Sequence, residues 1–161
     1  MDNYILANEI IFNSKPDAVP YNYRISYKMS QLCLILSNVC TNGSGCTLVK
    51  IHIVSNALNT VENMKILDDY VNERTAYMIV RFDPAVNRAI KYAVGDGLIY
   101  QLKNGSFKLT DKGKCLVKEI NKETDLLIKE KHYLSVLGNK LSASLIERLM
   151  SSWRYSNVED K

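Results

Sequence analysis

Long apolar runs are missing from this sequence of 161 residues. A helix that crosses a membrane needs about 20 consecutive apolar residues, so no membrane-spanning segment is expected. The N-terminus carries Asp2 and Glu9 around short apolar stretches, which is unlike a secretory signal peptide. Only three prolines and seven glycines interrupt the chain, and its length suits a single domain. We therefore predict one compact cytoplasmic domain without a membrane partner.

Residue types and spacings that support catalysis are also scarce. The two histidines, His52 and His132, form no metal-ligand pair by spacing, and no Cys-x-x-Cys motif is present. The glycine-rich Asn42–Gly45 segment lacks the lysine of a phosphate-binding loop, so it is typical of a turn between helices. Adjacent Asp68 and Asp69 would diverge by about 100° on a helix, a poor acid–base pair. We predict no catalytic residue, no metal and no cofactor, and we expect His52 to be a packed or half-exposed residue of its helix.

Cysteine is limited to four residues, which could form two disulfides by number alone. Cys33 and Cys115 fall within apolar helical patterns, where a reduced cysteine packs as a small apolar side chain. We therefore expect free thiols in a reducing compartment.

Apolar spacing divides the chain into an N-terminal arm (1–25), a core (26–120) and a C-terminal helical extension (121–161). The arm has two short apolar patches that suit an edge strand or a docking segment. Helices are expected from Ser26 to the Asn42 turn, after Thr47 and after Thr60, because capping residues precede apolar residues at helical spacing. Alternating apolar residues then predict a short strand at Met78–Phe82.

The second half of the core has stronger signals. Asp83-Pro84 begins a helix that Gly95 and Gly97 end, because aspartate caps free N–H groups and proline tolerates the first helical position. Alternation on both sides of Asn104-Gly105 predicts a hairpin with a two-residue turn. One long helix is expected from Thr110 to Gly138. A final helix is expected from Ser142, with Ser144-x-x-Glu147 as a capping box.

Positive charge gathers around this predicted helix and hairpin. The segment 81–118 contains eight basic and three acidic residues, a net charge of +5, whereas the whole chain carries only +4. Helices followed by a helix, a hairpin with a basic tip and another helix is the order of a winged helix-turn-helix. The predicted fold is therefore mainly α with a small β-hairpin wing, extended by the N-terminal arm and the C-terminal helices.

In such a fold, one helix can enter the major groove of DNA while the wing contacts the backbone. We expect Arg88 and Lys91 to contact base edges or phosphates and Lys103 and Lys108 to contact phosphates, with Lys112 as a further nucleic-acid or partner contact. A basic helix face can also be simply solvated, and winged helices also serve as protein-docking modules.

The segments Arg81-Phe-Asp-Pro-Ala-Val-Asn-Arg-Ala-Ile-Lys-Tyr-Ala, Gly97-Leu-Ile and Asn104-Gly-Ser-Phe-Lys-Leu-Thr-Asp-Lys-Gly113 resemble a known family. They are similar to the small middle components of three-component ABC ATPase systems, including the small C subunit of Lamassu-type anti-phage defence operons. The resemblance implies a non-enzymatic subunit that sits on an SMC- or Rad50-like ATPase and couples DNA sensing to an effector subunit. The ATPase and effector chemistry would then belong to the partner chains.

The C-terminal extension offers apolar residues for such partners. Leu149 and Trp153 lie on the apolar side of the last predicted helix, and we expect them at a partner interface, although core packing remains open for Trp153. The alternative function is a free-standing transcription regulator that dimerises and reads an operator with the same helix and wing.

Overall fold

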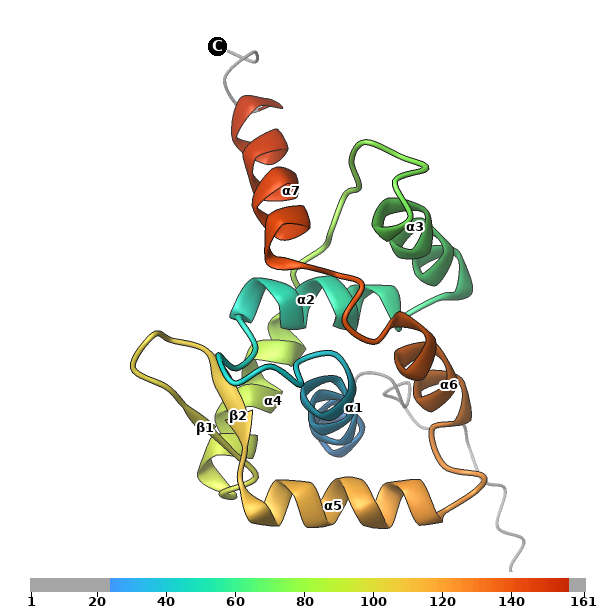
Figure 1. Ribbon diagram of the computed structural model, residues 1–161. Coiled ribbons are helices and arrows are strands. Elements are labelled where there is room, and N and C mark those ends of the chain that lie inside the picture. The colour runs from blue at the N-terminus through green and yellow to red at the C-terminus, as the bar shows by residue number, and fades with distance from the viewer. Residues whose placement is uncertain (1–23, 157–161) are drawn as a thin grey trace, which may run out of the picture.

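The computed structural model describes residues 24–156, with side chains to Arg154, so nearly all of the expected N-terminal arm lies outside the described residues. The described chain is mainly helical with one small antiparallel sheet (Figure 1). None of the helices between residues 24 and 156 is both long and apolar enough to cross a membrane. The elements are α1 (Ile25–Asn38), α2 (Leu48–Ala57), α3 (Val61–Val71), α4 (Pro84–Gly95), β1 (Ile99–Gln101), β2 (Phe107–Leu109), α5 (Asp111–Lys122), α6 (Ile128–Leu137) and α7 (Ala143–Ser156).

Capping residues mark most helix starts as expected. The side chains of Thr47, Thr60, Asp83 and Thr110 each accept a backbone N–H in the first turn of α2, α3, α4 and α5. The hydroxyl of Ser142 accepts the N–H of Leu145 at the start of α7.

One expected start is shifted, because the first helix begins at Ile25, so Ser26 lies inside it and Arg24 occupies the cap position without a capping side-chain bond. The last helix starts as expected, with Ser142 directly before α7. Ser142 itself caps this helix, two residues before Ser144 of the expected capping box.

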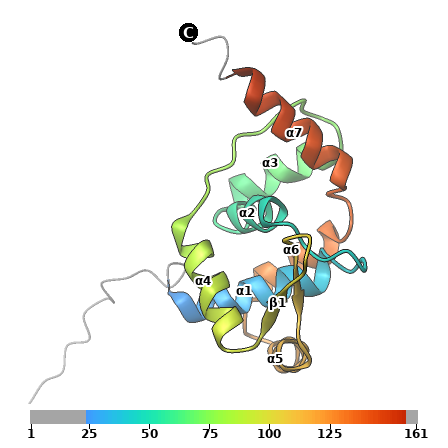
Figure 2. The same cartoon turned by 90° about the vertical axis from the view of Figure 1, so that its left-hand side faces the viewer.

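Helix α1 is the centre of the core. It packs against α2, α4, α5, α6 and β2, while α3 packs on α2 (Figures 1 and 2). A single cluster of buried apolar residues draws on all seven helices and on both strands, so the expected core and C-terminal extension share one interior. Leu34, Ile35, Ile51, Leu134 and Leu149 are among its fully buried members.

The predicted strand at Met78–Phe82 is wrong. This segment is an extended connector between α3 and α4 and pairs with no strand in the described part of the chain. Side chains satisfy parts of its backbone instead: the N–H of Arg81 donates to the Asn56 side chain (3.3 Å), and the Trp153 indole N–H donates to the Met78 carbonyl (3.0 Å). Of the alternating apolar residues, Met78 is buried but Phe82 is 50% exposed, because an alternating pattern does not supply a partner strand.

The predicted single helix from Thr110 to Gly138 is two helices. α5 ends at Lys122, and Leu127 adopts a left-handed backbone conformation (φ 52°) before α6 begins. The Lys131 amine donates to the carbonyls of Ile120 (3.1 Å) and Glu123 (2.6 Å), which binds α6 to the open end of α5. The break lets α6 return to pack on α1.

The hairpin is present, with a longer turn than expected. Ile99, Tyr100 and Gln101 pair with Leu109, Lys108 and Phe107 in that order. The N–H of Gly105 donates to the Leu102 carbonyl (2.9 Å), so Lys103 and Asn104 are the central turn residues and Gly105 follows at φ 81°. This is a three-residue loop in which glycine takes the left-handed position. Cys46 adds a short antiparallel bridge to Phe107 on the other edge of β2.

The cysteines differ from the expectation of four free thiols. Cys40 and Cys46 form a disulfide across the turn between α1 and α2. Their proximity follows from this turn, which brings Cys46 back to β2, and sequence spacing does not show it. Cys33 is a free buried thiol as expected, and burial raises its pKa to about 11, whereas Cys115 is exposed.

Gly113 determines how closely α5 approaches the base of the hairpin, at Leu98 and Leu109. A Cβ built on Gly113 would lie 2.1 Å from the carbonyl oxygen of Leu98 and 2.9 Å from a methyl group of Leu109. Real Cβ atoms do not approach this closely, so only glycine lets α5 start directly behind the hairpin.

Replacing Gly113 with alanine is therefore expected to lower the free energy of unfolding by about 1–3 kcal/mol, the usual cost of overpacking a close contact. Urea unfolding followed by circular dichroism measures this loss. Gly43, whose Cβ would meet no atom within 4 Å, is the matched control, and Gly43→Ala is expected to change stability little. Equal losses in the two variants would contradict the close approach.

Candidate nucleic-acid and partner interface

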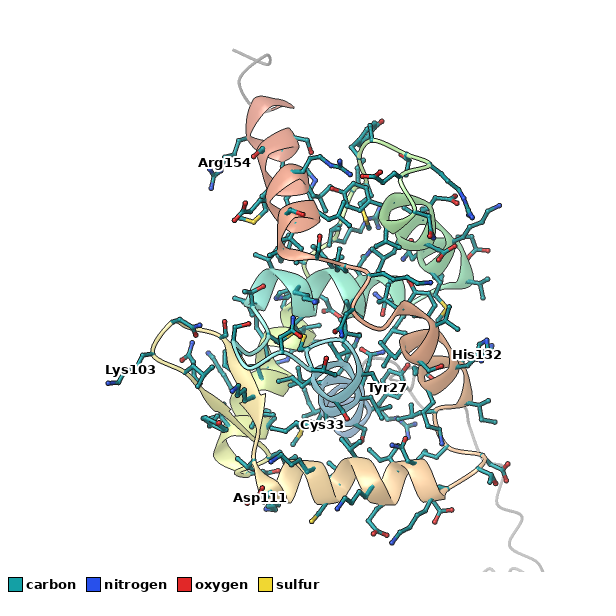
Figure 3. The ribbon with its side chains drawn as sticks, viewed as in Figure 1. Tyr27, Cys33, Lys103, Asp111, His132 and Arg154 are labelled. Carbon is teal, nitrogen blue, oxygen red and sulfur yellow. A yellow bond between two sulfur atoms is a disulfide. The ribbon has the colours of Figure 1, made fainter. Side chains whose placement is uncertain are left out.

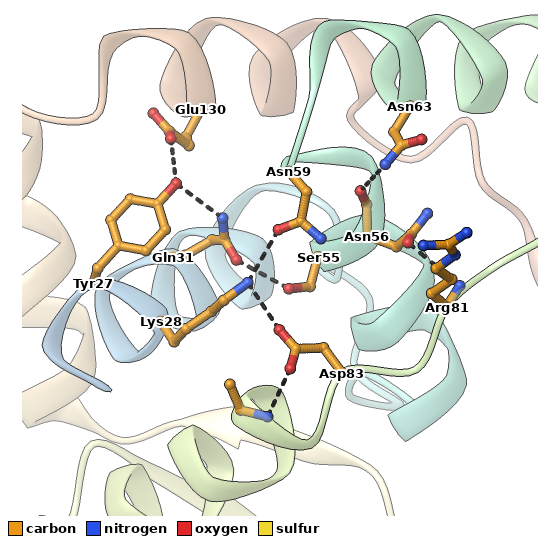
Figure 4. Close-up of polar contacts among 11 residues, drawn as sticks. Tyr27, Lys28, Gln31, Ser55, Asn56, Asn59, Asn63, Arg81, Asp83 and Glu130 are labelled. Atoms are coloured by element: carbon orange, nitrogen blue, oxygen red, sulfur yellow. Dashed lines mark hydrogen bonds and ion pairs between the residues drawn. The ribbon is translucent and has the colours of Figure 1, made fainter. Parts of the chain in front are cut away.

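A buried lysine fixes where α4 begins. The side chain of Lys28 on α1 is 1% exposed, and its amine lies 3.5 Å from a carboxylate oxygen of Asp83 and 3.2 Å from the side-chain oxygen of Asn59 (Figure 4). The other carboxylate oxygen of Asp83 accepts the N–H of Ala85 (2.8 Å), so one carboxylate joins α1 to the first turn of α4. Burial lowers the pKa of Lys28, and the charge of Asp83 opposes that shift.

A second chain of polar contacts continues from α1 toward α2 and α6. Tyr27 donates to Glu130 (2.6 Å), Gln31 donates to Tyr27 (3.3 Å), and Ser55 donates to Gln31 (3.0 Å). These contacts pair the polar groups of buried Gln31 and Ser55, as a low-dielectric interior requires. Together with Lys28, they hold the orientation of the helices around α1.

Exposed cations line the outer side of α4. Ala85, Val86, Ala89, Ile90 and Ala93 form its buried stripe, which leaves the other side to solvent. Arg88 and Lys91 are exposed, as expected from their spacing, and neither has a hydrogen-bond or ion-pair partner among residues 24–154. Both charges therefore remain available to an external anion.

The hairpin carries further lysines next to α4. Lys103 is exposed in the turn and projects away from the body of the molecule (Figure 3). Lys108 on β2 is half-buried and pairs in register with Tyr100, so both side chains lie on one face of the hairpin. The structure thus brings Lys103 and Lys108 onto one hairpin, whose strand β1 contacts α4.

Lys112 has an internal partner, unlike the other expected contacts. Its amine donates to the backbone carbonyl of Asp96 (2.7 Å) at the C-terminal end of α4. A cation at this position also interacts favourably with the helix dipole. We assign Lys112 mainly to joining α5 to α4.

A hollow of about 360 Å³ lies on the side of the hairpin that faces the end of α1. Lys108, Tyr100, Thr41 and Asn42 line it, together with Lys114, whose amine forms an exposed ion pair with Asp111 (3.1 Å). Spacing along the chain does not reveal this hollow, because loop 40–43 and the hairpin meet only in the folded protein.

The two residues expected at a partner interface have different positions. Leu149 is completely buried, so it belongs to the core and its expected role as a surface anchor is wrong. Its place on the apolar side of α7 could not show which neighbours would cover it. Trp153 is half-buried, and besides its bond to Met78 its ring meets Phe82 edge-on, with 6.1 Å between centroids.

The histidines do not form a catalytic arrangement. His52 is buried, and its Nε2 lies 3.0 Å from the side-chain oxygen of Asn87, while its Nδ1 has no hydrogen-bond partner within the described chain. His132 projects from α6 on the other side of the molecule from Lys103 (Figure 3). Across residues 24–156, no group of three or more histidine, cysteine or acidic residues is placed to hold a metal ion.

Sequence reasoning missed two features of this region. The burial of Lys28 had a signal, because Lys28 lies four residues before Leu32 on the apolar side of α1. The sequence also indicates that Ile79 is exposed, because Ile79 is the apolar residue on the outer side of the alternating segment. Neither signal shows by itself that the residue is functional.

Comparisons with protein-family models, curated proteins and solved structures give no significant match to this chain. The geometry of the described residues therefore carries the functional argument.

Substitutions at the buried pair are expected to have unequal effects. Asp83→Ala removes the cap of α4 and leaves Lys28 buried without its counter-charge, so we expect a loss of about 3–5 kcal/mol in unfolding free energy. Lys28→Met fills the space and keeps the cap, and Asp83 stays partly hydrated at 21% exposure, so we expect less than half that loss. Urea unfolding of both variants checks the order. The reverse order would show that the pair does not anchor α4.

Proposed function

We propose that this chain is a non-catalytic binding subunit of winged helix-turn-helix type that contacts duplex DNA through α4 and the hairpin. The order of α1, the Cys46 bridge, α2, α4 and the hairpin supports this proposal, because a winged helix-turn-helix has helices, a short strand and a wing in that order. α3 and the connector would be an insertion before α4. In this arrangement α4 is the helix that precedes the wing. The His52–Asn87 contact between α2 and α4 supports the pairing of these two helices.

The observation that carries the proposal is the set of unpaired cations on the α4–hairpin unit. Arg88, Lys91 and Lys103 are exposed without an anionic partner in the described chain, whereas Lys114 and Lys122 pair with Asp111 and Glu119. Phosphate oxygens are the most common anions to satisfy such groups at a nucleic-acid interface. Arg88 and Lys91 are one turn apart on one helix, which suits contact along a groove.

The resemblance of segment 81–113 to middle components of three-component ABC ATPase systems supports a place in a larger complex. We propose that the chain joins an SMC- or Rad50-like ATPase to an effector subunit in anti-phage defence, with the reaction chemistry in those partners. The alternative is a free-standing regulator, since the same α4–hairpin order also reads operators. The two functions predict different DNA binding by the purified chain alone. A regulator binds its own operator as a symmetric dimer at nanomolar affinity, whereas a subunit binds DNA weakly without its partners.

Removing the unpaired cations is expected to weaken DNA binding in a salt-dependent way. In fluorescence anisotropy with a labelled duplex, Arg88→Ala, Lys91→Ala and Lys103→Ala should each lower affinity. Each lost phosphate contact should also reduce the slope of log affinity against log salt concentration by about 0.9. Lys129→Ala and Lys140→Ala, which remove exposed lysines outside the α4–hairpin unit, are matched controls. Equal effects of control and test variants would contradict the proposed DNA surface.

A further inference from the structure

We propose that the connector strip, formed by Tyr77, Ile79 and Phe82 with Arg81 and Arg88 beside it, is the docking site for an acidic segment of a partner protein that carries apolar anchors. This inference rests on the proposal that the chain is a subunit of a complex. It goes further by assigning a surface and the chemistry of the segment that covers it.

The connector strip exposes apolar side chains that the core leaves uncovered. Ile79 is 77% exposed, Tyr77 is 63% exposed and Phe82 is 50% exposed, within a few residues of one another. A single exposed apolar residue is ordinary, but three within the six residues 77–82, with charged residues next to them in the chain, have the composition typical of a protein interface. The backbone of the connector runs along the outside of the molecule from α3 to α4 (Figure 2).

Contacts on either side of the connector hold the strip in place. Trp153 of α7 donates to the Met78 carbonyl, and the Arg81 N–H donates to Asn56 of α2, so the backbone is anchored at two points. Met78 is buried beneath the strip. A surface fixed before binding loses little conformational entropy when a partner arrives, which favours docking.

The charges beside the strip determine the chemistry of the partner. The side chains of Arg81 and Arg88 have no carboxylate partner among residues 24–154, and Asp83, the acid between them, is already engaged by Lys28 and the start of α4. The His52 ring lies 4.7 Å from the Phe82 ring and contacts Asn87, which places Phe82 beside the N-terminal half of α4, the helix that also carries Arg88. Carboxylates flanking an apolar anchor would complement this surface.

A nucleic acid fits the connector strip less well than a protein segment does. A base needs a free ring face for stacking, but the Phe82 ring packs against His52 and meets the Trp153 ring edge-on. Ile79, the most exposed residue of the strip, is aliphatic, so Tyr77 is the one strip residue whose ring makes no ring contact within residues 24–154. A single ring does not provide the series of stacking platforms that a nucleic-acid strand uses. Apolar anchors held between cations are instead a pattern that peptide segments recognise.

The first test is site-specific crosslinking of the full-length chain in cells that carry its native neighbouring genes. A photoreactive phenylalanine analogue replaces Ile79 in one variant and exposed Ser135 on α6 in the control. Peptide mapping of the crosslinks at position 79 is expected to identify one segment of a partner protein that contains apolar and acidic residues, which the control does not capture. Crosslinks to DNA, to a second copy of this chain, to a segment without acids, or to nothing would each overturn the proposal.

The second test uses a synthetic peptide with the sequence of the crosslinked segment, titrated against the full chain by fluorescence anisotropy. Ile79→Glu and Arg81→Glu are each expected to weaken peptide binding about tenfold or more, since each removes an anchor or reverses a charge in the strip. Ser135→Glu should leave binding unchanged. Unchanged affinity in Ile79→Glu, with a native circular dichroism spectrum, would overturn the assignment of the strip.

The same variants separate this inference from the DNA proposal. Ile79→Glu should leave duplex binding intact, and Lys103→Ala should leave peptide binding intact, because the two side chains lie on different elements. A chain that binds the peptide but no duplex would contradict only the proposed DNA surface. A chain that binds duplex but no peptide would contradict only the connector strip.

Discussion

The ion pair between Lys28 and Asp83 is the interaction on which the functional surfaces depend. A cation buried in the centre of a helical core needs a counter-charge, and Asp83 supplies it while also capping α4. This requirement fixes the end of the connector and the first turn of α4 relative to α1. The cations of α4 and the apolar residues of the connector therefore have defined positions because of one buried contact.

The two proposed surfaces lie on consecutive parts of the chain, and they differ in chemistry. The connector strip presents Ile79 and Phe82 close in sequence to Arg81, which suits a protein segment, whereas the exposed cations Lys91 on α4 and Lys103 in the hairpin suit phosphate contacts. Arg88 lies where the two surfaces meet. For the proposed subunit, DNA and a partner protein would then bind at neighbouring surfaces, and coupling between the two sites would let binding at one change the affinity of the other.

Local signals predicted much of the fold, and tertiary contacts decided the rest. Capping by Thr47 and Asp83 depends on residues within one turn, so it is readable from sequence. The connector at Met78 had the alternation of a strand, but forming one requires a partner edge that spacing cannot reveal. For the site, helical period correctly placed Arg88 on the surface. Helical period could not show whether Leu149 is buried or exposed, because its burial depends on neighbours that are distant in sequence.

The most direct test of the account is the mass of the complex that forms around the chain. The tagged protein would be purified at moderate salt from cells that carry its native neighbouring genes, and intact assemblies would be measured by native mass spectrometry. The account predicts a complex of fixed stoichiometry that contains a large coiled-coil ATPase. Recovery of the chain alone as a symmetric dimer would contradict the subunit assignment and favour a free-standing regulator.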